Sequence, residues 1–117
     1  MSLPRLPYSP VIRSGDHVFT AGQVAHGLDG AIVRGGIAEQ TTQTLANLTA
    51  CLAAAGCGLD DVQKVNVFLA DLADFEGFNA VYRTSFAEPF PARTTVRVGL
   101  PPGLLIEIEA VARLPGR

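Results

Sequence analysis

Residues 91–112 carry the clearest alternation of apolar and polar side chains. Apolar or β-branched residues hold the even positions in 94–98 and again in 106–112, with a Leu-Pro-Pro-Gly segment between the two runs. This pattern predicts two strands joined by a loop. If the even positions share one buried face, the odd positions share the opposite face. We therefore expect Arg93 and Glu107 to lie near each other on one surface of a sheet.

Shorter runs predict the remaining strands. We expect strands over 8–13 and 17–24, joined as a hairpin at a Ser-Gly-Asp turn, a short strand over 31–34, and another over 62–69. Gly22 lies inside the second run, which indicates a bulge or a close backbone approach.

Two segments have helical periodicity. The first is expected over 37–55, where leucines recur at 45, 48 and 52 and a glycine follows at 56. The second is expected over 72–87, with an aromatic stripe at helical spacing that is typical of a core-facing surface. The stripe comprises Phe75, Phe78, Tyr82 and Phe86.

These elements predict one α+β domain over 1–117, with a mixed sheet of five or six strands. Each helix connects two strands, which favours parallel pairing there and antiparallel hairpins at the ends. Two helices can cover only one face of such a sheet. The other face is expected to be part apolar and part charged, so we predict a homo-oligomer with ligand clefts between subunits. The side chains assigned to that face are Arg93, Thr95, Arg97, Leu105, Glu107, Glu109 and Val111.

The composition of the chain excludes some classes of function. The chain has 117 residues, 17% of them charged, and a formal net charge of −2 without a cluster of Lys and Arg. This disfavours a dedicated nucleic-acid-binding protein. No run is long and apolar enough to span a bilayer, and residues 1–10 lack an apolar signal region, so we expect a cytoplasmic protein. Cys51 and Cys57 are expected to be reduced thiols, and no His lies at metal-ligand spacing from them, so no metal is expected.

Arg93 and Glu107 are the first candidates for chemistry. A guanidinium can bind the carboxylate of a small organic acid through two hydrogen bonds. The alternative is a cross-strand ion pair with Glu107 or Glu109, and spacing does not decide between them. Glu107, in a cleft, could orient or deprotonate a water molecule, whereas in an exposed strand it would be a solvated surface residue.

Two further residues are weaker candidates. Tyr8, beside Pro7, could present its hydroxyl to a ligand or simply pack on the sheet as a rim aromatic. Thr95 is two residues beyond Arg93 and would lie beside anything that Arg93 binds, or it is an ordinary β-branched strand residue. His17 and His26 are read as surface residues. No local arrangement suggests a covalent nucleophile.

Several motifs together resemble a known family. Phe90-Pro-Ala-Arg-Thr-Thr-Val, followed by Leu100-Pro-Pro-Gly and Ile106-Glu-Ile-Glu-Ala-Val-Ala, resembles the signature of the RidA/YjgF reactive-intermediate deaminases. Shorter matches extend over nearly the whole chain in the same order. They are Pro7-Tyr8-Ser9, Thr20-Ala21-Gly22-Gln23, Thr41 with Asn47-Leu48, Val65-Asn66-Val67-Phe68-Leu69 and Phe78-Asn79-Ala80-Val81-Tyr82.

The resemblance implies a chorismate-mutase-like fold, a homotrimer with three sites between subunits, and no cofactor. It implies hydrolysis of 2-imino or enamine acids to 2-keto acids and ammonia. By match to the motif, Arg93 would bind the substrate carboxylate and Glu107 would position the attacking water. Tyr8 would line the site, and Thr95 would face the imine.

Two departures from the family pattern bear on activity. Ala21 stands in the site segment where the family often has a hydroxyl residue, and Pro10 stands where Gln is common. Loss of a hydroxyl removes one possible hydrogen bond, about 1 kcal/mol or more in a closed site. An alternative function is therefore a non-catalytic module that binds a small carboxylate metabolite. A nucleolytic function is disfavoured by the charge.

Overall fold

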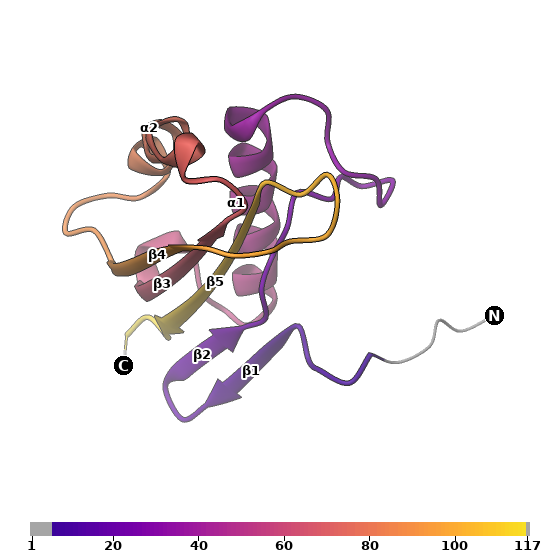
Figure 1. The fold of residues 1–117 in the computed structure, drawn as a ribbon. Coiled ribbons are helices and arrows are strands. Elements are labelled where there is room, and N and C mark those ends of the chain that lie inside the picture. Colours follow the sequence, from indigo (N-terminus) through magenta and orange to yellow (C-terminus); the bar gives the residue numbers. More distant parts are fainter. Residues whose placement is uncertain (1–5, 117) are drawn as a thin grey trace.

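The computed structural model describes residues 6–116 and contains five strands and two α-helices in this range (Figure 1). The elements, in chain order, are β1 (Val11–Ser14), β2 (His17–Thr20), α1 (Ile37–Ala54), a 3-10 turn (Leu59–Asp61), β3 (Val62–Leu69), a 3-10 turn (Leu72–Asp74), α2 (Phe75–Ser85), β4 (Ala92–Arg97) and β5 (Ile106–Arg113).

The strands form one mixed sheet in the order β1-β2-β5-β3-β4. Only β3 and β4 pair in parallel, across the α2 connection, and the other neighbours are antiparallel. The expected α+β class, the parallel pairing beside a helix and the antiparallel hairpin at the start are confirmed. No described helix is long and apolar enough to cross a membrane.

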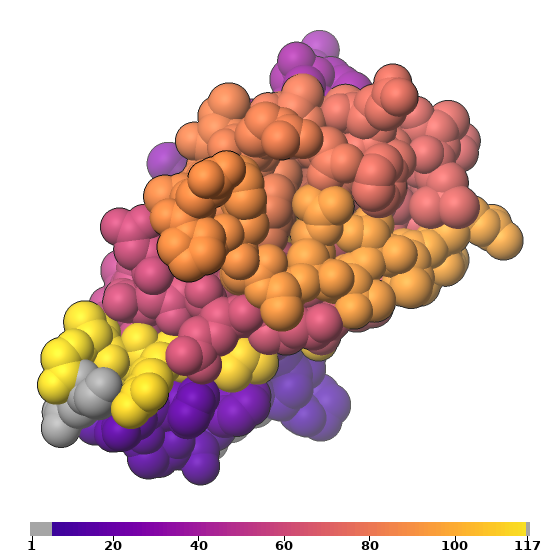
Figure 2. Space-filling view, turned by 90° about the vertical axis from the view of Figure 1, so that its left-hand side faces the viewer, coloured from indigo at the N-terminus to yellow at the C-terminus, as the bar shows by residue number. Residues whose placement is uncertain are grey.

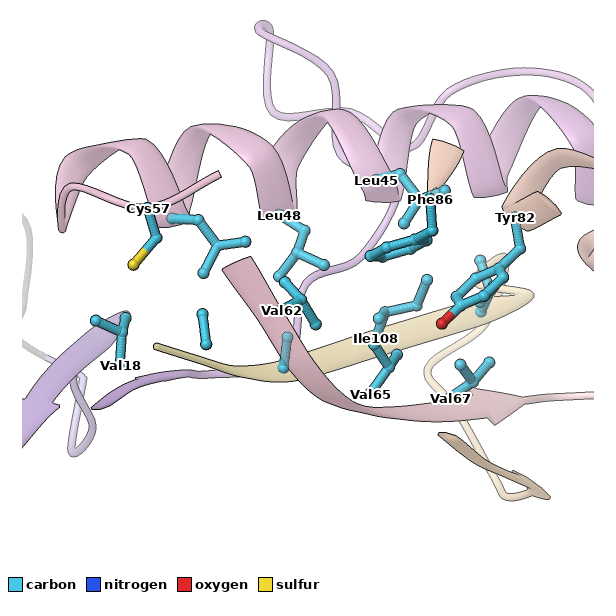
Figure 3. Close-up of a cluster of buried hydrophobic side chains, with 14 of the residues drawn as sticks. Val18, Leu45, Leu48, Cys57, Val62, Val65, Val67, Tyr82, Phe86 and Ile108 are labelled. Carbon is cyan, nitrogen blue, oxygen red and sulfur yellow. The ribbon is translucent and has the colours of Figure 1, made fainter. Parts of the chain in front are cut away.

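Both helices pack on the same face of the sheet, as predicted (Figures 1 and 3). The leucine stripe of α1 is buried against the strands, and the aromatic stripe of α2 adds Phe78, Tyr82 and Phe86 to the same core. From the strands, Val65, Val67 and Ile108 point into this layer (Figure 3). Within residues 6–116, no helix covers the opposite face of the sheet.

The N-terminal strands are shorter than expected. The run over 17–24 pairs as a strand only to Thr20, and Gln23 then forms an isolated bridge with Ile108 of β5. The segment expected as a strand over 31–34 makes one bridge, between His26 and Ile32. Gly22 falls at the break, where its backbone comes so close to a neighbouring side chain that it leaves no room for a Cβ. The expectation of a close approach at Gly22 is thus confirmed.

The predicted proximity of Arg93 and Glu107 on one face is wrong within a single chain. β4 and β5 do not pair with each other, because β3 lies between them. Val65 of β3 is aligned with Arg93 on one side and Ala110 on the other. Neighbours in register share a face, so Arg93 lies on the helix side with Ala110, opposite to Glu107.

The same register corrects the face assignment for the rest of β4. Thr95 and Arg97 are aligned with Val67 and Leu69, which are fully buried under the helices. The apolar even position Val96 is instead 41% exposed on the open face. Because β4 is an edge strand, its apolar residues do not mark the core-facing side.

The open face of the sheet carries rows of apolar side chains with polar side chains between them. One apolar row crosses three strands through Ile12, Phe19 and Val111, and the first two side chains are 53% and 45% exposed. A second row aligns Val96, Phe68 and Glu107. Between them, Lys64 donates a hydrogen bond to Thr94, and Asn66 donates one to Glu109. The predicted mixture of apolar and acidic residues on this face is therefore present, without Arg93, Thr95 and Arg97.

Candidate active site

Arg93 is fixed against the aromatic stripe of α2. Its guanidinium carbon lies 4.7 Å from the ring centroid of Tyr82, 5.0 Å from that of Phe78 and 5.7 Å from that of Phe75. A cation over aromatic faces is attracted by the ring quadrupoles, and Arg is the side chain that stacks best in this way. The cross-strand ion pair with Glu107 or Glu109 is therefore excluded within one chain, and the guanidinium edge is left to bind an anion.

A cavity of about 240 Å³ opens beside this guanidinium. It lies between α2, the segment after it and the start of β4, which are side by side on the face shown in Figure 2. Its walls combine aromatic and proline surfaces with an amide and two guanidinium groups. The lining residues are Asn79, Tyr82, Arg83, Phe90, Pro91 and Arg93.

Two hydroxyl groups near Arg93 are buried without a hydrogen-bond partner. One is the Oγ1 of Thr95, on the same side of β4 as Arg93, and the other is the hydroxyl of Tyr82. Burial raises the pKa of Tyr82, and the adjacent Arg93 partly opposes this rise. Tyr82 lines the cavity, whereas Thr95 is not among the lining residues. Buried polar atoms normally have partners, so these two unpaired hydroxyl groups mark the surroundings of Arg93 as a candidate site.

Glu107 occupies a different environment, on the open face. Burial raises the pKa of its carboxyl group, and the nearby Glu109 raises it further. A Cβ built on Gly22 would lie 2.6 Å from its Oε2 atom, so the backbone of Gly22 covers one side of the carboxylate. Two backbone hydrogen bonds between Gln23 and Ile108, of 2.7 and 3.0 Å, hold this segment against β5.

The remaining predicted residues lie apart from both groups. Ala21 is half-buried in the segment beside β5, and its amide donates to the carbonyl of Pro10 at 2.9 Å. Tyr8 is 61% exposed on the segment that leads away from β1 (Figure 1). One chain therefore brings Arg93 and Thr95 together on the helix side and places Glu107 on the open side. Ala21 and Tyr8 belong to neither group.

A polar row on α1 holds the two segments that flank Glu107. The buried Gln40 donates to the carbonyl of Gly103 at 2.8 Å and accepts from the amide of Leu105 at 2.9 Å. Asn47 donates to two carbonyls of the segment after Gly22, each at 2.8 Å. The sequence pattern did not predict these contacts, because the periodic pattern of this helix came from its leucine stripe.

The cysteines and histidines take no part in either group. Cys51 and Cys57 are free thiols, and both histidines are exposed, as expected. Within residues 6–116, no three His, Cys, Asp or Glu side chains gather in a way that could hold a metal ion.

Comparison with known proteins places these features in a family. The family model described as endoribonuclease L-PSP matches residues 2–114. A RutC family protein of Pyrococcus horikoshii is 49% identical over 110 residues, which cover 91% of this chain and 86% of that protein. The human protein named 2-iminobutanoate/2-iminopropanoate deaminase is 43% identical over 110 residues, covering 91% and 79%.

Solved structures agree with the sequence comparison. RidA from the Antarctic bacterium Psychrobacter has a TM-score of 0.87 and 36% identity, and the match covers 96% of this chain and 92% of that one. A yeast protein has a TM-score of 0.90 and 37% identity over 96% and 90% of the two chains. Sequence and fold together show that this chain belongs to the YjgF/RidA family.

Proposed function

We propose that this protein hydrolyses 2-imino acids and their enamine tautomers to 2-keto acids and ammonia, at sites shared by two copies of the chain in a homotrimer. The observation that carries the proposal is the fixed guanidinium of Arg93 at a small cavity whose lining contains no carboxylate. Such a group binds the carboxylate of a small acid through paired, charge-assisted hydrogen bonds. The deaminase name of the 43%-identical human relative supports the reaction class.

The reaction needs a water molecule and a group that handles its proton. The water oxygen adds to the imine carbon and one water proton passes to nitrogen, which gives an adduct with a hydroxyl and an amino group. The hydroxyl proton is then transferred to the amino nitrogen as the carbon–nitrogen bond breaks, and the products are the keto acid and ammonia. Glu107 is suited to this role, because its raised pKa brings its proton exchange closer to neutral pH than that of an exposed carboxyl group. No cofactor is needed, because the imine is already an electrophile.

A second copy of the chain is required, because Arg93 and Glu107 of one chain face opposite sides of the sheet. The open face has exposed apolar side chains in rows, which a neighbouring sheet can cover. Closing a ring of copies over these faces would bring the Glu107 side of one chain to the Arg93 edge of the next. In this arrangement Thr95 would face the imine, and Tyr8 and Ala21 would line the site from the neighbouring copy.

The test is a coupled assay in which an amino-acid oxidase generates 2-iminobutanoate and the formation of the keto acid is followed. We expect the protein to accelerate this step over spontaneous hydrolysis, and Arg93→Ala to abolish the acceleration while the trimer remains. Arg34→Ala is the control, because Arg34 is exposed and lies outside both groups of site residues. An unaccelerated reaction with the intact protein would refute the proposal.

The alternative is a metabolite-binding protein without turnover, and Ala21 is the observation that favours it. A methyl group there cannot donate the hydrogen bond that a hydroxyl would give to the substrate or the water. Thermal stabilisation by 2-oxobutanoate, lost in Arg93→Ala, together with no acceleration of imine hydrolysis, would favour this alternative. Restored hydrolysis in Ala21→Ser would assign the defect to the missing hydroxyl.

A further inference from the structure

The cavity beside Arg93 contains a second guanidinium group. Arg83 lies on α2 four residues after Asn79, and residues at this spacing lie on the same face of a helix. Both residues line the cavity, together with Phe90 and Pro91 of the segment after the helix. Arg83 thus belongs to the walls of the space into which Arg93 faces.

The charge of the cavity exceeds what one carboxylate neutralises. Two arginines and no Asp or Glu line it, although the whole chain has a formal net charge of −2. Grouped charges of one sign in a hollow attract a ligand of the opposite sign. A ligand with a single carboxylate on Arg93 would leave the second guanidinium without an anionic partner.

The two guanidinium groups differ in burial and in contacts. Arg93 is half-buried and stacked against three aromatic rings, whereas Arg83 is exposed in the last turn of α2. Arg93 is therefore suited to fix the carboxylate next to the reacting carbon, whose position determines the chemistry. Arg83 can adjust to a more distant group. The cavity of about 240 Å³ also fits a small acid better than a ligand of drug size, for which pockets of about 300–1,000 Å³ are usual.

We infer that Arg83 is a specificity-determining residue that directs the site toward imino acids with a second carboxylate, and 2-iminoglutarate serves as the test compound. The inference rests on the proposed function and names the substrate class of that site. Hydrolysis of this compound consumes one water and gives 2-oxoglutarate and ammonia. Arg93 binds the carboxylate next to the imine, and Arg83 binds the distal one.

The alternative role of Arg83 is purely helical, because a cation in the last turn stabilises the helix dipole. The two roles predict different kinetics. A helix-dipole role would affect folding and leave the choice of substrate unchanged. A contact with the distal carboxylate changes kcat/KM for the diacid relative to the monoacid.

The experiment compares 2-iminoglutarate with 2-iminobutanoate, each generated by an amino-acid oxidase, in the wild-type protein and in Arg83→Gln. We expect the ratio of kcat/KM, diacid over monoacid, to fall by about tenfold or more in the variant, the size of one charge-assisted hydrogen bond. Arg83→Lys should retain part of the ratio, and Arg34→Gln, which removes the same charge elsewhere, should leave it unchanged.

Two kinetic outcomes overturn the inference. An equal loss of kcat/KM for both imines means that both arginines hold one carboxylate, and an unchanged kcat/KM for each imine means that Arg83 acts only on the helix. If the wild-type protein hydrolyses neither imine, the proposed function fails. The role of Arg83 is then tested by calorimetric binding of the two products. Tighter binding of 2-oxoglutarate than of 2-oxobutanoate, with the difference lost in Arg83→Gln, supports the inference, whereas equal binding overturns it.

Discussion

Replacing Gly22 with alanine tests whether the backbone at this position orients the Glu107 carboxylate. A Cβ at Gly22 would lie 2.6 Å from Oε2 of Glu107, 2.7 Å from its Cδ and 3.0 Å from its Cγ. All three contacts are to one side chain. Gly22 does not have a positive φ, so alanine introduces no backbone strain there. The added methyl group therefore acts on the position of Glu107.

The size of the effect follows from these distances. Moving the carboxylate oxygen from 2.6 Å to 3.4 Å, where ordinary van der Waals contact begins, requires a shift of about 0.8 Å. A misplacement of about 1 Å in an active site can cost about 100-fold in rate, so we expect kcat/KM to fall by about ten- to 100-fold. The effect on stability should be small, because Glu107 is only half-buried and can move. The added methyl group destabilises the folded chain by about 1 kcal/mol through overpacking. Alanine also lowers the conformational entropy of the unfolded chain, which stabilises the fold by a similar amount.

A double-mutant cycle in urea separates the contact from the backbone effect. In a Glu107→Ala background the methyl group has no side chain to displace, and Gly22→Ala should then stabilise the fold by about 0.4–1 kcal/mol. Gly99→Ala is the matched control, because nothing lies within 4 Å of a Cβ at that position. If Gly22→Ala retains imine hydrolysis within about twofold of wild type, the carboxylate is not held by this contact and the reasoning is refuted.

Three further predictions concern the residues around the site. Gln40→Met should lower the free energy of unfolding, measured in urea, by about 1–3 kcal/mol, because it leaves the carbonyl of Gly103 and the amide of Leu105 unpaired. The control Gln43→Met loses only the bond to Asn47 and should lower the free energy of unfolding by less. For Glu107, the raised pKa means that the folded chain holds the proton more tightly than the unfolded chain, so its contribution to stability is present at acid pH and is lost as pH rises through the raised pKa. The free energy of unfolding of Glu107→Gln should therefore increase relative to that of the wild type as pH rises through this pKa. A difference between the two proteins that stays constant at all pH values would contradict this. Tyr82→Phe keeps the ring under Arg93 and removes a buried hydroxyl without a partner, so its unfolding free energy should be unchanged or higher by about 1 kcal/mol; a clear loss would show that the hydroxyl is hydrogen-bonded to Arg93.

The sequence predicted the helices well because their burial pattern is local. The leucine stripe of α1 is buried against the sheet, and so are Phe78, Tyr82 and Phe86 of the predicted aromatic stripe, whereas Phe75 is 37% exposed. The family motif singled out Arg93 and Glu107 as candidate site residues, and their roles stay predictions. Their placement on one surface was wrong, because it depended on which strand lies between β4 and β5, and strand order is a property of the whole sheet.

Other features could not be predicted because their cause lies in tertiary contacts. The alternation in β4 was read as a core-facing pattern, but an edge strand can turn its apolar residues to the open face, as Val96 shows. No sequence pattern pointed to Gln40, because its burial depends on the position of the Gly103–Leu105 segment. No motif or periodic pattern pointed to Arg83, because its place in the cavity depends on how α2 packs beside the Phe90–Pro91 segment.

Subunit complementation tests most directly the claim that the active site is shared by two copies. Arg93→Ala and Glu107→Ala chains, each inactive alone, are unfolded together in equal amounts and refolded into mixed oligomers. If each site takes Arg93 from one copy and Glu107 from its neighbour, random mixing leaves about a quarter of the sites with both groups intact. The account predicts recovery of about a quarter of the wild-type rate of imine hydrolysis. Mixed oligomers, verified by mass spectrometry, that stay as inactive as their parents would contradict it.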